Sequence, residues 1–158
     1  MNEFEFAELL LQTAHALEDR EPELLAMSGI ASIHGVDILV EFDADQHGGC
    51  ICCYIDLGEI DRYAAGDLSQ QLLSLNLLSG SRTTGVYALD EETGHPVFIV
   101  HLLDVNTIDG PCLAQALRVY AKEARQVRSR ILSNWTDEPT DFVQDTTVIS
   151  SLIPFNPV

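Results

Sequence analysis

A helix with leucines on two sides is the clearest pattern along the chain. Residues 68–79 are predicted to be helical because Asp67 can cap the start and Gly80 suits the left-handed position after the end. Successive residues of a helix are rotated by about 100°. The leucines therefore fall on one side (Leu68, Leu72, Leu75), on the opposite side (Leu73, Leu77) and on a flank (Leu78). A helix lying on its own sheet needs one apolar side only, so we expect the second side to meet another surface, most simply a second copy of the chain.

The stretch after this helix is predicted to be a β-hairpin with two apolar faces. Residues 85–89 and 97–103 form its strands, and residues 90–96 form its turn. In the second strand both alternating sets are apolar, with Val97, Ile99 and Leu103 on one face and Phe98, Val100 and Leu102 on the other. Either both faces are covered within a single subunit, or a partner covers one of them. Left exposed, such surfaces would promote aggregation.

The N-terminal half is predicted to contain one helix and three meandering strands. Residues 3–18 are amphipathic and end before Pro22, which has no amide hydrogen to continue a helix. The stripe that faces the core is spaced by four, four and three residues: Phe6, Leu10, Ala14 and Leu17. The period then changes to two, with a tight turn at His34 followed by strands at residues 36–43 and 50–57.

Four apolar side chains lie off the core stripe of their element and are candidates for binding a partner: Phe4, Leu9, Leu11 and Leu39. The exposed edge of the hairpin formed by residues 30–42 could add an extended segment as a further strand. Such a segment loses conformational entropy when it becomes ordered, so its recognition needs both backbone hydrogen bonds and pockets for alternate side chains. Packing within the subunit is the alternative for all four residues.

A long amphipathic helix and a tail are predicted for the C-terminal part. Asp109 can cap this helix, and its buried stripe is spaced by four, three, four, three and four residues: Leu113, Leu117, Tyr120, Ala124, Val127 and Ile131. The composition becomes acidic at Asp137, and an apolar stretch follows at residues 152–155. We therefore predict one domain, residues 1–135, and a tail, residues 136–158, which either docks on this subunit or a neighbour or is disordered.

The charge of the chain narrows the range of its partners. Twenty-five acidic and eight basic residues give a net charge of −17, which repels nucleic acids and anionic membranes and favours basic or amphipathic partners. Residues 109–133 differ from the rest, because they hold five of the bases and only two acids. The chain starts without a signal-peptide pattern and has no run of about 18 apolar residues. We expect a cytoplasmic protein that neither binds nucleic acid nor inserts into a membrane.

The sequence shows no constellation of residues that is typical of catalysis or of a cofactor site. Cys50 and Cys52 alternate with Cys53 along a predicted strand, a pattern of packed thiols rather than of a zinc site. The histidines are scattered, and phosphate-binding glycine loops and a nucleophile elbow are missing. A small thiol enzyme that pairs a cysteine with His34 or His47 is the alternative. We expect a binding module without enzymatic activity, metal or cofactor.

The predicted order of elements, helix, three strands, helix, two strands and helix, resembles that of the class I type III secretion chaperones of the Tir chaperone (CesT) family. The residues that carry the likeness are DLSQQLLSLN at 67–76, GVYALD at 85–90 and the helix at 113–132. Length, acidity and the lack of catalytic residues are also similar, and the likeness extends over residues 4–133. It implies an α+β fold in which helices pack on a strongly twisted antiparallel sheet.

The resemblance also implies a function. Chaperones of this family act as homodimers that bind the N-terminal chaperone-binding segment of a secreted effector in the bacterial cytoplasm, without ATP, and keep the effector stable and competent for secretion. In the family the second helix and the strand after it build the dimer, which implies an interface here at Leu72, Leu75, Asn76, Val86 and Tyr87. A regulatory or scaffold domain of the same fold that binds a globular partner is the alternative.

Overall fold

The computed structural model describes residues 1–18, 22–45, 49–60, 68–79 and 85–133. Their helices and strands follow one another as α1 (Glu3–Leu17), α2 (Pro22–Ser28), β1 (Ile30–Ile33), β2 (Val36–Asp43), β3 (Cys50–Asp56), α4 (Leu68–Ser79), β4 (Gly85–Leu89), β5 (Pro96–Leu102) and α5 (Gly110–Leu132). The predicted caps Asp67 and Gly80 and the predicted tail, residues 136–158, lie outside the described residues. The predicted α+β fold is confirmed.

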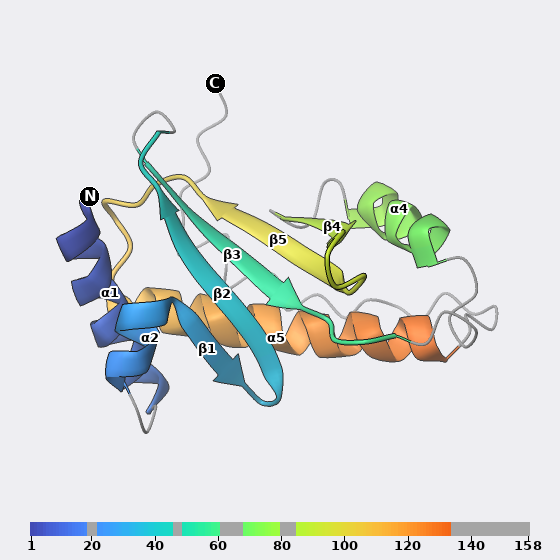
Figure 1. Cartoon of the computed structure of the whole chain (residues 1–158), viewed down its shortest axis with the longest axis horizontal. Helices are drawn as coiled ribbons and strands as arrows, with labels where there is room; N and C mark the ends of the chain where they lie inside the picture. The colour runs from blue at the N-terminus through green and yellow to red at the C-terminus, as the bar shows by residue number, and fades with distance from the viewer. Residues whose placement is uncertain (19–21, 46–48, 61–67, 80–84, 134–158) are drawn as a thin grey trace.

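Five antiparallel strands form one sheet in the order β1-β2-β3-β5-β4. The strands β1 and β2 are joined by His34 and Gly35, whose φ angles of 53° and 77° are those of a tight two-residue hairpin turn. The strand β2 also pairs with β3. The β4–β5 hairpin then folds back so that β5 pairs with the other side of β3, with Ile99 opposite Tyr54. This order leaves β1 and β4 as the two edges of the sheet (Figure 1).

The core lies between one face of the sheet and α5, which runs along the length of the sheet (Figure 1). The stripe predicted for this helix is confirmed, because all of its members are buried: Leu113, Leu117, Tyr120, Ala124, Val127 and Ile131. They form one cluster with inward-facing side chains of the central strands, among them Ile38, Val40, Ile51, Ile55, Phe98 and Val100. The predicted cap is also present, since the Asp109 carboxylate accepts a hydrogen bond from the Cys112 amide at 2.8 Å.

The helices α1 and α2 lie at one end of the sheet, and α4 lies at the other end beside β4 (Figure 1). The start of α1 is closed by Asn2 and Glu5, each of which accepts a hydrogen bond from the backbone amide of the other, at 2.9 and 2.8 Å. The helix packs on α5 and α2. Its Phe6 ring lies 5.7 Å from the ring of Phe42 on β2, and this contact joins α1 to the sheet.

The short helix α2 is not among the predicted elements. Pro22 marked the end of the predicted N-terminal helix, but proline is equally suited to the first turn of a new one. Leu25 of this helix is completely buried. Gly29 follows at a φ of 70°, where an added Cβ would collide with the carbonyl oxygen of Val40. The helix thus turns the chain into β1 through a position that only glycine fits.

Candidate functional site

The leucines of α4 divide into a buried and an exposed set. Leu68, Leu72 and Leu75 are 7%, 3% and 4% exposed, whereas Leu73, Leu77 and Leu78 are 70%, 84% and 58% exposed. The predicted two-sided pattern is confirmed, but the side that packs on the chain's own sheet is the one with Leu72 and Leu75. We call the exposed set, Leu73, Leu77 and Leu78, the outer leucine face.

The residues expected at a dimer interface are mostly inside the subunit. Leu72, Leu75 and Tyr87 belong to the core, because α4 lies against β4 and buries the side of the helix that faces this strand. Val86 is 51% exposed, since alternation along β4 turns it away from α5. Among the described residues of α4 and β4, the exposed large apolar side chains are therefore those of the outer leucine face together with Val86 and Leu89.

The side chain of Asn76 covers the outer edge of β4. Its amide nitrogen donates to the Tyr87 carbonyl oxygen at 2.8 Å, and its Oδ1 accepts from the Tyr87 amide at 2.7 Å. Asn76 thus takes the place that a neighbouring strand would occupy, which keeps this edge from pairing with another chain. This predicted interface residue makes its contacts within its own subunit.

The side chain of Tyr87 attaches β4 to α5. Its ring stacks on that of Phe98 with centroids 4.7 Å apart, and Phe98 meets Tyr120 edge to face at 6.2 Å. The Tyr87 hydroxyl donates to the Glu123 carboxylate at 2.8 Å. Burial raises the pKa of the Glu123 carboxyl, and the bond from Tyr87 opposes this shift by stabilising the charged form. Burial also raises the pKa of the Tyr87 hydroxyl, which remains a donor at neutral pH.

The opposite edge, β1, has no comparable cover in the part of the chain that the structure describes. The register across the two-residue turn directs the backbone hydrogen bonds of Ala31 and Ile33 to β2. The backbone groups of Ile30 and Ser32 point away from β2 for the same reason. The Ile30 amide donates to the Ser28 hydroxyl at 3.2 Å. The backbone of Ser32 is therefore the part of this edge best placed to pair with an added strand.

The face of the sheet opposite α5 carries a continuous row of apolar side chains. One residue of each strand stands in register across the whole sheet: Ile30, Leu39, Tyr54, Ile99 and Val86. We call this set the apolar row. Its two ends, Ile30 and Val86, are about half exposed, and the three residues between them are partly buried. The row offers a strip on which an extended apolar segment could lie.

The four side chains predicted to bind an effector do not share one environment. Phe4 is 78% exposed, and Leu11 is partly buried seven residues later on the same side of α1. Leu39 belongs to the apolar row. Leu9 is 6% exposed and belongs to the core cluster, and its helix packs against both α5 and α2. Leu9 is therefore a core residue, and only Phe4, Leu11 and Leu39 remain surface candidates.

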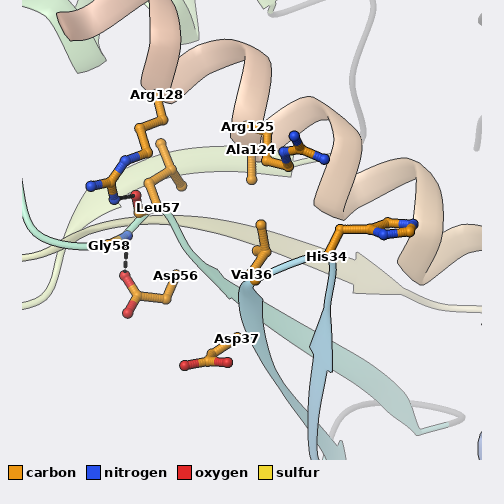
Figure 2. A pocket seen from close by; sticks show the side chains of 10 residues that line it. His34, Val36, Asp37, Asp56, Leu57, Gly58, Ala124, Arg125 and Arg128 are labelled. Carbon is orange, nitrogen blue, oxygen red and sulfur yellow. Dashed lines mark hydrogen bonds between the residues drawn. The ribbon is translucent and has the colours of Figure 1, made fainter. Parts of the chain in front are cut away.

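A cavity of about 350 Å³ opens where the turn between β1 and β2 and the end of β3 approach α5 (Figure 2). Its walls are formed by His34, Gly35, Val36, Asp37, Asp56, Leu57, Gly58, Ala124, Arg125 and Arg128. These residues come from three segments that are far apart in the chain. No local pattern in the sequence could bring them together, so the cavity is not among the predicted sites.

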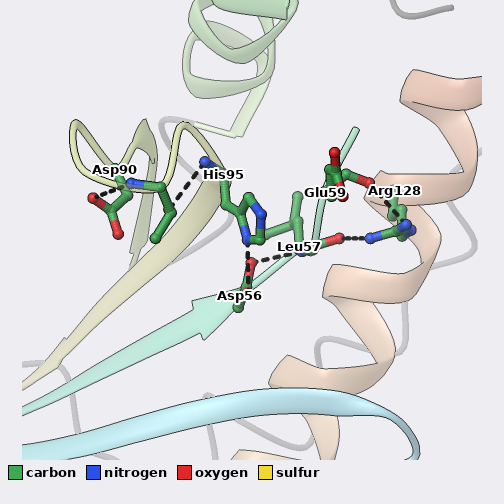
Figure 3. Close-up of polar contacts among 8 residues, drawn as sticks. Asp56, Leu57, Glu59, Asp90, His95 and Arg128 are labelled. Atoms are coloured by element: carbon green, nitrogen blue, oxygen red, sulfur yellow. Dashed lines mark hydrogen bonds and ion pairs between the residues drawn. The ribbon is translucent and has the colours of Figure 1, made fainter. Parts of the chain in front are cut away.

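Two polar groups hold the end of β3 at this cavity (Figure 3). The Arg128 guanidinium of α5 donates to the carbonyl oxygens of Leu57 and Glu59. The Asp56 carboxylate accepts from the Gly58 amide at 2.6 Å, and its second oxygen lies 3.2 Å from Nδ1 of His95. Both Arg128 and Asp56 are thus engaged within the chain.

The three cysteines of β3 are packed thiols. Cys50, Cys52 and Cys53 are buried and alternate as predicted, with the sulfur atoms of Cys50 and Cys52 3.8 Å apart. Burial raises the pKa of Cys50 to about 11 and that of Cys53 to about 12. These two thiols stay protonated at neutral pH and are weak nucleophiles. His47, a candidate base for a thiol enzyme, lies outside the described residues.

We expect the cysteines to be dispensable for partner binding. Replacing Cys50 and Cys52 together with alanine should leave binding intact and lower stability, since each change removes a buried sulfur atom. In the unmodified protein, iodoacetamide should label the partly exposed Cys112 well before Cys50 or Cys53. Mass spectrometry of native and urea-unfolded samples measures this order. Rapid labelling of Cys50 in the native protein, or stoichiometric bound zinc, would contradict a packing role.

Two further features bear on the class of protein. The described residues hold no group of three or more His, Cys, Asp or Glu side chains that could bind a metal ion. Among the same residues, none of the helices combines the length and the apolar character needed to cross a membrane. The exposed apolar features of the described structure are the outer leucine face and the apolar row, which ends at the edge strand β1.

Known proteins with a similar sequence or fold point to one family. The model of the Tir chaperone protein (CesT) family matches residues 38–128, which is more than half of the chain. A chain in the crystal structure of the ExsC–ExsE complex is similar over 81% of this chain and 94% of its own length, with a TM-score of 0.63. The two are 18% identical in sequence, so this likeness shows the fold alone. A comparison with curated protein sequences gave no match.

The family match begins in β2 and ends in α5, so it includes most of β2, all of β3 and α4, the β4–β5 hairpin and most of α5. The chain belongs to the Tir chaperone (CesT) family of type III secretion chaperones, which are not enzymes.

Proposed function

We propose that the protein acts as a homodimer in the bacterial cytoplasm, where it binds the N-terminal chaperone-binding segment of a secreted effector. Binding keeps the effector stable and competent for secretion. Membership of the family supports this role. The observation that carries it is the contrast between the two edges of the sheet, because Asn76 covers β4 whereas no described residue covers β1 in the same way. An edge left open in this manner beside an apolar row suits the capture of an extended chain.

The outer leucine face is the surface we assign to the dimer. Leu73, Leu77 and Leu78 together would be an aggregation hazard on a monomer. A two-fold axis beside α4 would bring the same face of two copies together and remove it from water. Half-exposed Val86, on the strand next to α4, would extend this contact. The open edge of β1 lies at the far side of the sheet and would stay free in such a dimer.

The effector segment is proposed to pair with β1. Its backbone would bond to that of Ser32, and its alternate side chains would reach the apolar row at Ile30 and Leu39. Phe4 and Leu11, on one side of α1, would contact apolar side chains further along the segment. An ordered segment needs both kinds of contact, because backbone hydrogen bonds alone are also available from water.

Co-purification with the protein encoded beside this chain tests the proposed function. The full chain should bind the N-terminal segment of that protein alone, and the segment should gain protection from proteolysis when bound. Hydrogen exchange should slow in β1 of the chaperone on binding. Binding that requires a folded domain and leaves the N-terminal segment unprotected would instead identify a scaffold for a globular partner.

A further inference from the structure

The basic residues of the described structure are confined to one helix. Every lysine and arginine among residues 1–18, 22–45, 49–60, 68–79 and 85–133 belongs to α5: Arg118, Lys122, Arg125, Arg128 and Arg130. Arg118 donates to the Ala16 carbonyl oxygen at 2.8 Å. Lys122 and Arg125 are exposed and three residues apart, with Lys122 opposite the buried stripe of α5 and Arg125 on the flank of the helix. They form a basic surface on a chain whose net charge is −17.

The cavity of about 350 Å³ borders this basic surface, because Arg125 and Ala124 belong to its wall. Val36, Leu57 and Ala124 supply apolar parts of the wall. In Figure 2 Arg125 lies on the α5 side, and Asp37 lies across the cavity from it. A ligand that suits this arrangement places an apolar side chain in the cavity and carboxylates along α5, away from Asp37.

A segment of the same chain has this composition. Residues 137–145, DEPTDFVQD, contain four acids, no base and the aromatic Phe142. They follow Ser133, the last described residue, after a short stretch. Arg125 precedes Ser133 by eight residues, or about 12 Å along the helix. Asp141 follows Ser133 by eight residues, which span up to about 26 Å when extended, so the segment is long enough to reach back to Arg125.

We propose that residues 137–145 dock on α5 of the same chain, with Phe142 in the cavity and the acidic side chains beside Lys122 and Arg125. The many acidic residues elsewhere in the chain repel this segment, whereas the surface of α5 attracts it. Attachment through a short connection gives an effective concentration of about a millimolar, so a weak contact is enough to hold the segment in place.

Hydrogen–deuterium exchange of the full-length protein tests this proposal. In a buffer of low ionic strength, residues 137–145 should exchange about two- to tenfold more slowly than in the Lys122→Glu, Arg125→Glu variant. Salt at about 0.5 M should remove the difference, because it screens exposed charges. Phe142→Ser should also remove it while leaving the sequence of the domain unchanged.

Two controls separate docking from a general effect of charge. Gln115→Glu also adds one negative charge to an exposed position of α5, but it lies seven residues before Lys122 and ten residues, about 15 Å, before Arg125, so protection should persist. Arg125→Glu combined with Asp141→Arg should restore protection that Arg125→Glu alone removes. Equal exchange in all of these proteins would overturn the proposal. Protection that rises with protein concentration would also overturn it, because the segment would then dock on a second copy.

Discussion

Aspartate at both Leu73 and Leu77 should convert the proposed dimer into folded monomers. Both side chains belong to the outer leucine face and are 70% and 84% exposed, so the fold of one subunit does not depend on them. Each substitution occurs twice in a two-fold dimer, which removes four leucines from the contact. At roughly 2 kcal/mol for each leucine, the Kd for dimerisation should rise by more than about a thousandfold.

The same substitution at Leu75 should unfold the subunit instead of separating two folded subunits. Leu75 is 4% exposed and lies in the apolar core, where a carboxylate is removed from water. The cost of several kcal/mol is comparable with the whole stability of a small domain, about 5–15 kcal/mol. Leu75→Asp should therefore unfold the subunit, although it is only two residues from Leu73 and Leu77.

Light scattering at micromolar concentration and thermal unfolding by circular dichroism distinguish these outcomes. The double variant should keep the circular dichroism spectrum of the unmodified protein with half its mass, and Leu75→Asp should lose the cooperative transition. A monomeric mass for the unmodified protein would reject the dimer. A dimeric double variant would place the interface on another surface.

The sequence predicted that α4 has two apolar sides but not which side meets the sheet. Leucines occur on both sides of the helix, so their spacing alone does not indicate which side is buried. The asymmetry comes from Asn76, which adjoins the buried side and bonds to the backbone of Tyr87. An asparagine close to the buried side of a helix that precedes an edge strand is the signal that could have oriented α4.

The position of β5 inside the sheet explains why both faces of the predicted hairpin are apolar. Its strand β5 lies inside the sheet between β3 and β4, which alternation along the chain could not reveal because pairing with β3 is a long-range contact. Phe98 on one face is buried against α5 through Tyr120. Ile99 on the other face belongs to the apolar row and is partly buried. One face thus serves the core, and the other supports the proposed binding of an effector.

Long-range packing also explains why the other site residues could not be predicted correctly from the sequence. Leu9 and Leu11 are both off the predicted stripe of α1, but α2 was not among the predicted elements and its cover over α1 could not be foreseen. Leu9 belongs to the core, whereas Leu11 is only partly buried. The cavity beside Arg125 is a meeting of three distant segments and has no local signature.

Aspartate at both Leu11 and Leu39 should weaken binding of the effector segment by more than about tenfold. Leu39 lies in the apolar row and Leu11 lies on α1, and both are partly buried in the free chain. Each leucine that contacts the segment contributes roughly 2 kcal/mol when it is fully covered, so partial loss at two sites exceeds a factor of ten. Calorimetry with the N-terminal segment of the effector measures the change. A folded, dimeric variant with unchanged affinity would show that the groove is elsewhere.

Proline at Ser32 should weaken the same complex through the backbone. The Ser32 amide points away from β2, so a proline removes no hydrogen bond from the sheet but deletes a donor to an added strand. We expect a loss of about tenfold or more in affinity, since the proline ring also crowds the approaching backbone. Ser32→Thr keeps the amide and favours a strand, so it is the matched control. If the proline variant stays folded and binds as tightly as the threonine variant, the segment does not pair with β1, and the apolar row alone would have to hold it.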